Sequence, residues 1–122
     1  DGITKDIEKY ANIIKEKRPK IKSEVKLFLP HPAMEIAPEH NLVQTVQKNA
    51  TEVTRKEKPI TGATYWADSG LLNGLSNIPT LLFGPGDIGC AHSDKEFIET
   101  SHITPAAKIY ALTALDICGV RD

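Results

Sequence analysis

Hydrophobic positions recur at helical spacing over residues 3–14 of the chain. One stripe of a 3.6-residue period is occupied by the side chains of Ile3, Ile7, Tyr10, Ala11 and Ile14. This stripe predicts an amphipathic helix. A basic run that contains Pro19 closes the helix, because proline cannot continue the helical hydrogen bonding.

The next segment changes to a period of two. Apolar and polar side chains alternate over residues 23–29, as they do in a half-buried β-strand. A helix followed by a strand is half of a small α+β lobe. Three prolines then fall within residues 30–38, where we expect an extended crossing between domains. We therefore divide the chain into residues 1–34 and residues 35–122.

The second part alternates helix-like and strand-like patterns. The expected elements, in chain order, are a helix capped by Asn41, a β-prone segment over 59–65, a short helix over 68–75, an apolar strand over 78–83, and a helix from Thr104-Pro105 to Gly119. Strand, helix and strand in this order indicate parallel pairing. The predicted fold class is α/β, with a sheet sandwiched between helices and ligands at the carboxyl ends of its strands.

Composition and charge narrow the class of protein. The length of 122 residues suits one compact domain or two small lobes. No apolar run approaches the ~20 residues of a membrane helix, and no signal-like run opens the chain, so we expect a cytoplasmic protein without a membrane partner. The net charge of -1 lacks the long-range field that nucleic-acid binding needs.

The charges are unevenly distributed along the chain. Residues 1–58 carry 12 basic and 9 acidic side chains, whereas residues 59–122 carry 3 and 7. The two halves are therefore expected to face different surroundings. Cys90 and Cys118 lack the spacing of a zinc ribbon or a disulfide scaffold, so both are expected to be reduced thiols.

A histidine and two carboxylates follow the apolar segment 78–83. A glycine-rich turn delivers His92, Asp94 and Glu96 within five residues, after a predicted strand end where catalytic groups commonly lie. Imidazole is a good zinc ligand, and nearby carboxylates can orient it without touching the metal. These residues alone also fit a solvent-exposed histidine, which is the more common case.

Three separated blocks resemble the C-terminal signature of a family of metal-dependent amidohydrolases. The blocks are TYWADSGLL at residues 64–72, IPTLLFGPG at 78–86 and AHSDKEF at 91–97. Their order and spacing are similar to those of acetylornithine deacetylase, succinyl-diaminopimelate desuccinylase, aminoacylase and related dinuclear zinc peptidases. The resemblance implies that residues 35–122 are the C-terminal part of a three-layer helix-sheet-helix catalytic domain. It implies that residues 1–34 are the exit half of a small α+β lid, through which members of this family dimerise.

The resemblance also implies roles for individual residues. His92 matches the last metal ligand of the family, and Asp94 and Glu96 fall in the flanking box, where a supporting role is expected. A substrate-binding wall is implied for Tyr65, Trp66 and Asp68. Ala67 stands where many members have threonine, which puts one hydroxyl contact with the substrate in doubt.

Cofactor and reaction follow from the same resemblance. Family members hold two divalent ions, zinc or else cobalt or manganese, and use metal-activated water to hydrolyse N-acyl amino acids or small peptides. Nothing in residues 1–58 resembles the His-x-Asp pair, the bridging aspartate or the Glu-Glu pair of the family. We therefore assign no catalytic residue and expect a fragment that is inactive alone, with a homodimer through the lid in the longer enzyme.

Two other interpretations remain. A non-catalytic α/β interaction module, complete at this length, would explain the missing ligands, and its oppositely charged halves would suit pairing with a protein partner. A hydrolase that uses Cys90 with His92 is poorer, because side chains two residues apart in a loop do not align and no orienting acid is evident. Surface or capping roles are expected for the other histidines, His31, His40 and His102.

Overall fold

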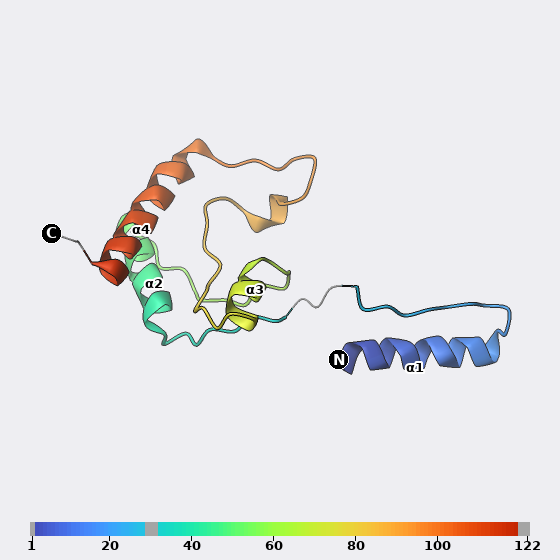
Figure 1. Cartoon of the computed structure of the whole chain (residues 1–122). Helices are drawn as coiled ribbons and strands as arrows, with labels where there is room; N and C mark the ends of the chain where they lie inside the picture. The colour runs from blue at the N-terminus through green and yellow to red at the C-terminus, as the bar shows by residue number, and fades with distance from the viewer. Residues whose placement is uncertain (1, 29–31, 120–122) are drawn as a thin grey trace. The chain divides into compact units, whose positions relative to one another are not determined.

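The computed structural model describes residues 2–28 and 32–119, and the regular structure in these residues is helical (Figure 1). The elements are α1 (Gly2–Lys17), α2 (Asn41–Thr54), α3 (Ser69–Gly74), the 3₁₀ turn η1 (Ile88–Cys90) and α4 (Thr100–Cys118). The chain divides into two compact units, Asp1–His31 and Pro32–Asp122. Their identification with a lid and a catalytic domain stays a prediction.

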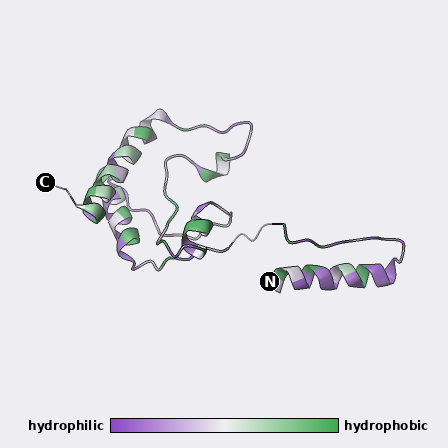
Figure 2. Ribbon diagram, viewed as in Figure 1, coloured by the Kyte–Doolittle hydropathy of each residue, from purple (hydrophilic) through white to green (hydrophobic). Residues whose placement is uncertain are grey.

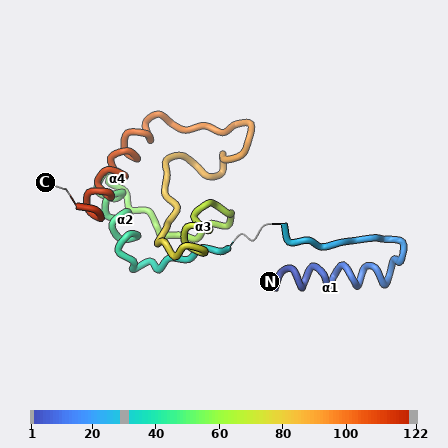
Figure 3. The backbone as a smooth tube through the Cα atoms, in the orientation of Figure 1, coloured from blue at the N-terminus to red at the C-terminus, as the bar shows by residue number. Residues whose placement is uncertain are grey.

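The first unit is an amphipathic helix followed by an extended segment. α1 confirms the helix predicted from the apolar stripe, and Lys15 and Lys17 lie in its last turn, where cations face the negative end of the helix dipole. The chain then reverses direction, with the N–H of Ile21 bonded to the carbonyl of Arg18, and continues extended to residue 28 (Figure 3). No residue of α1 is buried, so burial stabilises this helix little.

The core of the second unit lies between α2 and α4, the helices that pack against each other (Figure 1). Its buried apolar side chains are those of Val43, Ala106 and Ile109. A buried amide joins the two helices. Asn49 is only 2% exposed, and its Nδ2 donates to Oγ1 of Thr113 at 3.3 Å and to Oδ2 of Asp116 at 3.1 Å. Because a buried polar group needs such partners, these hydrogen bonds favour the packing in which Asn49 faces Thr113 and Asp116.

Both ends of α2 are closed by hydrogen bonds. His40 is the N-cap, and its Nδ1 accepts from the N–H of Leu42 at 3.1 Å, which confirms a capping role for this histidine. The predicted N-cap, Asn41, is already the first helical residue, so that prediction is wrong by one position. At the other end, Arg55 adopts a left-handed conformation with φ of 58°, and its N–H bonds the carbonyl of Thr51 at 2.8 Å.

The short helix α3 is crossed closely by the start of the second unit. It confirms the helix predicted for this part of the sequence. Gly70 and Gly74 lie four residues apart in α3, and a Cβ on each would meet the carbonyl oxygen of Pro32 at 2.6 Å and the Cβ of Pro32 at 2.7 Å, respectively. The N–H of Glu35 also lies 3.4 Å from Oδ1 of Asn73. This approach requires glycine, because any side chain would occupy the same space.

The predicted sheet is absent from the described part of the chain. The segments expected as strands, 23–28, 59–65 and 78–83, form no strand, and residue 29 lies outside the described residues. Outside the helices, the backbone hydrogen bonds found there connect positions no more than six apart. The α/β prediction, with its three-layer catalytic domain and its lid strand, is therefore wrong for this structure. Alternating or apolar patterns favour an extended backbone, but a strand forms only when a second strand pairs with its N–H and carbonyl groups.

The last helix begins four residues before its predicted start. The predicted start is Thr104, but α4 runs from Thr100 with Glu99 as its N-cap and contains Pro105. Pro105 is the sixth residue of α4, so it removes the hydrogen bond that an N–H at this position would donate to the carbonyl of Ser101. Hydrophobic residues are spread along α4 (Figure 2). No helix in residues 2–28 or 32–119 combines the length and apolar composition needed to cross a membrane.

Candidate functional site

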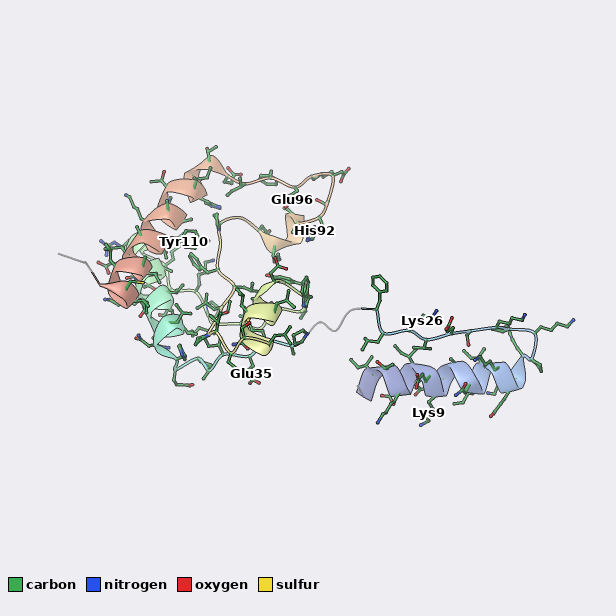
Figure 4. All side chains as sticks on the ribbon, in the orientation of Figure 1. Lys9, Lys26, Glu35, His92, Glu96 and Tyr110 are labelled. Carbon is green, nitrogen blue, oxygen red and sulfur yellow. The ribbon has the colours of Figure 1, made fainter. Side chains whose placement is uncertain are left out.

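The loop that carries His92 is attached to α4 at its root. The hydroxyl of Tyr110 donates to the carbonyl oxygen of Phe83 at 2.9 Å, and the two rings pack edge to face with centroids 5.6 Å apart. Phe83 is the last residue before the glycine-rich turn. Tyr110 of α4 therefore holds the chain at the point where the loop leaves the apolar segment; Figure 4 labels this tyrosine.

A left-handed glycine and a capped turn follow this root. Gly86 has a φ of 98°, a conformation that favours glycine. Asp87 then caps η1, because its Oδ1 accepts from the N–H of Gly89 at 2.9 Å and its carbonyl accepts from the N–H of Cys90 at 3.0 Å. Cys90 and Cys118 form no disulfide, and their reduced state stays a prediction. Local hydrogen bonds thus hold the loop backbone as far as Cys90.

His92 has an unusual backbone conformation within this loop. Its φ of 59° lies in the left-handed region that few non-glycine residues adopt. Its N–H donates to Oε2 of Glu96 at 3.0 Å. The hydroxyl of Ser93 donates to the carbonyl of Cys90 at 2.8 Å and accepts from the N–H of Lys95 at 3.2 Å. His92 is exposed, so its imidazole is accessible to a ligand while its main chain is held in place.

The structure brings one of the two predicted supporting carboxylates to His92. Glu96 makes the contact, through a side-chain oxygen and the main-chain N–H of His92 (Figure 4). Asp94 is exposed, and within the described residues its carboxylate has no hydrogen bond or ion pair. No contact among the described residues supports a role for Asp94 in orienting His92, so this role stays a prediction.

The residues predicted to form a substrate wall lie at the start of α3. Tyr65 and Trp66 are 48% and 45% exposed, and the indole nitrogen of Trp66 lies 3.2 Å from the position of a Cβ on Gly70. Asp68 is the N-cap of α3, although its side chain makes no capping hydrogen bond. The structure records no hydrogen bond from Tyr65 or Asp68 to the loop of His92. A wall shared with this loop stays a prediction.

The described residues do not form a metal site by themselves. Within residues 2–28 and 32–119, no group of three or more histidine, cysteine, aspartate and glutamate side chains is placed to hold an ion. A zinc site takes at least three protein ligands. The imidazole of His92 is exposed, and its role as a metal ligand stays a prediction.

A small pocket beside the loop is not predicted by the sequence pattern. It has a volume of about 110 Å³ and is lined by Gly86, Asp87, Cys90, Phe97, Glu99 and His102. Two of the lining residues, Asp87 and Glu99, are the N-caps of η1 and α4. A correct prediction of where these two helices start would have pointed to both residues. His102 is exposed, as expected, whereas His31 lies outside the described residues.

Comparisons with known proteins support the family resemblance of the three sequence blocks within residues 64–97. Residues 4–116 match the profile of peptidase family M20/M25/M40. Acetylornithine deacetylases from Klebsiella pneumoniae, Erwinia tasmaniensis and Salmonella arizonae are 32%, 34% and 30% identical over 92, 95 and 95 residues. Each alignment covers 75% of this chain and 22% of the relative, so the chain spans little more than a fifth of the relatives it matches. No solved structure matches the chain. Since the profile covers all three blocks and most of the remaining sequence, the chain belongs to peptidase family M20/M25/M40.

Proposed function

We propose that this chain is part of a metal-dependent hydrolase that removes the acyl group from N-acyl amino acids. The observation that carries the proposal is the family match over residues 4–116. The similarity to acetylornithine deacetylases favours an acetyl group, with desuccinylase, aminoacylase and small-peptide activities as narrower alternatives. The chain's own contribution to the chemistry is the loop that exposes His92.

The predicted metal ligand and the predicted substrate-wall residues have separate roles in this proposal. His92 supplies one nitrogen donor, held at a fixed place by its loop. Tyr65, Trp66 and Asp68 contact the substrate. When bound, two divalent ions of zinc, cobalt or manganese would supply an activated water and polarise the amide carbonyl. Cleavage of the amide then leaves a carboxylate and an amine.

The test uses the protein at its natural length. Replacing the ligand imidazole, as in His92→Ala, should lower the bound zinc measured by plasma mass spectrometry. It should also lower kcat for N-acetylornithine by about 10–100-fold or more, because even residues that only support a ligand cost this much. His102→Gln is the matched control, since it removes another exposed imidazole that matches no ligand position.

Two outcomes would contradict this proposal, the first in part and the second as a whole. If His92→Ala binds as much metal as the unaltered protein, His92 is not a ligand. If the unaltered natural-length protein binds no metal and hydrolyses no N-acyl amino acid, the non-catalytic interaction module becomes the better interpretation. The same measurements on the 122-residue chain should show weak metal binding and no hydrolysis, because its described residues form no group of three or more side chains placed to hold an ion. Dimerisation through a lid and a cytoplasmic location stay predictions.

A further inference from the structure

We infer that Glu96 is a positioning residue that sets the direction of the His92 imidazole by holding the His92 main chain in its left-handed conformation; the importance of that direction rests on the proposed function. The juxtaposition is specific: Oε2 of Glu96 accepts the N–H of His92 at 3.0 Å, and His92 has φ of 59°. The carboxylate therefore acts on the backbone of the ligand residue and not on the metal.

The conformation of His92 needs an explanation because it is intrinsically disfavoured. In the left-handed region the Cβ of an L-residue approaches the following carbonyl oxygen, and such residues persist only where surrounding contacts hold them. Histidine tolerates the region better than most residues do, but it still adopts it uncommonly. The direction of the Cα–Cβ bond, and with it the aim of the imidazole, changes if φ returns to the ordinary region.

The contacts that hold His92 come from the next four residues. The carboxylate of Glu96 is the acceptor for the His92 N–H, and hydrogen bonds to a charged acceptor are stronger than neutral ones. The N–H of Glu96 bonds the carbonyl of Ser93 at 3.2 Å, which returns the Glu96 side chain toward His92. The hydroxyl of Ser93 ties the same turn back to Cys90. The turn therefore brings the carboxylate of Glu96, and not that of Asp94, to the main chain of His92.

A glutamine at position 96 distinguishes a positioning role from a direct catalytic role. A positioning acceptor needs an oxygen at the end of a side chain of this length, which glutamine also has. A proton acceptor or a metal ligand needs the negative charge, which glutamine lacks. Glu96→Gln should therefore keep the loop conformation, whereas Glu96→Ala and the shorter Glu96→Asp should lose it.

The experiment measures the backbone of His92 in the isotope-labelled 122-residue chain by nuclear magnetic resonance. The readouts are the exchange rate of the His92 amide and its HN–Hα coupling, which reports φ. We expect Glu96→Ala and Glu96→Asp to speed amide exchange on the order of ten-fold and to shift the coupling, because a hydrogen bond to a charged group is lost. Glu96→Gln should keep most of both readouts, because its amide oxygen accepts the same hydrogen bond without the charge. Asp94→Asn removes a charge from the same loop without removing a contact, so it should change neither.

The outcomes distinguish this inference from the proposed function. If Glu96→Ala leaves both readouts of His92 unchanged, or if Glu96→Gln fails as completely as alanine does, the positioning role is wrong whatever the enzyme activity. If the backbone responds as expected but His92→Ala leaves the zinc content of the natural-length protein unchanged, the positioning role stands and the metal-ligand proposal fails.

Discussion

Two glycines of α3 show how a single residue can determine a backbone crossing. The carbonyl of Pro32 passes so close to Gly70 that an added methyl group would meet it at 2.6 Å. That contact is with backbone, which cannot move aside as the end of a flexible side chain can. The packing of α3 against the start of the second unit therefore depends on the absence of a side chain at this position.

We expect Gly70→Ala to destabilise the second unit. Alanine gains about 1 kcal/mol of helix propensity over glycine, but forcing a methyl group into a filled space costs about 1–3 kcal/mol, so the net effect is unfavourable. Urea unfolding followed by the fluorescence of Trp66, the one tryptophan of the chain, measures the change. Gly62→Ala is the control, because a Cβ there meets nothing within 4 Å. Equal midpoints for the two variants would contradict the close crossing.

Replacing the neighbouring residues Lys48 and Asn49 should lower the free energy of unfolding by different amounts. Asn49 makes buried hydrogen bonds, whereas Lys48 makes an exposed ion pair. Asn49→Ala leaves Thr113 and Asp116 without their shared donor, and should lower the free energy of unfolding by about 1–3 kcal/mol. Lys48→Ala removes an exposed ion pair with Asp116 at 3.8 Å and should cost at most about 1 kcal/mol. Helix content against urea concentration, from circular dichroism, ranks the two variants. A larger loss from Lys48→Ala would be inconsistent with a buried, bonded Asn49.

At the scale of elements, α4 connects the core to the candidate loop. Its buried Ala106 and Ile109 face the core, and its Tyr110 reaches the carbonyl of Phe83. The core and the loop root are thus attached to adjacent positions of one helix. The position of the loop therefore depends on the position of α4.

We expect Tyr110→Phe to loosen the loop without unfolding the helix. The ring contact with Phe83 is kept, whereas a hydrogen bond of about 0.5–1.5 kcal/mol is lost. Hydrogen–deuterium exchange over residues 78–97 should therefore rise several-fold, with little change in α2. Tyr10→Phe removes an exposed hydroxyl of α1 and should leave this exchange unaltered. Exchange that is identical in both variants would mean that the hydroxyl does not hold the loop.

At the scale of the whole molecule, many described residues lie in helices, but few side chains are buried. The buried apolar side chains of the described residues are Val43, Ala106 and Ile109, and α1 buries none. Many large apolar side chains, such as Phe28 and Leu75, remain exposed. Since apolar burial is the main favourable term in folding, each unit should have low and separate stability.

We expect the 122-residue chain to unfold over a broad temperature range. A 16-residue helix without buried residues is marginal in water, so α1 should exchange its amides sooner than α2 and α4, which pack against each other. Calorimetry together with hydrogen exchange measures both properties. One sharp transition, with equal calorimetric and van't Hoff enthalpies and equal protection of α1 and α4, would show that the units are more stable than their burial indicates.

The sequence alone determined the features that depend on neighbours along the chain. Apolar spacing located the helices, and three blocks within residues 64–97 identified the family and singled out His92. Only the tertiary structure decided the features that join distant or differently folded positions. It left the apolar segment 78–83 extended without a partner strand, tied Phe83 to Tyr110, and turned Glu96 toward the main chain of His92. The physical reason is that a residue pattern determines which conformations a segment prefers, whereas pairing and positioning also require another group at contact distance.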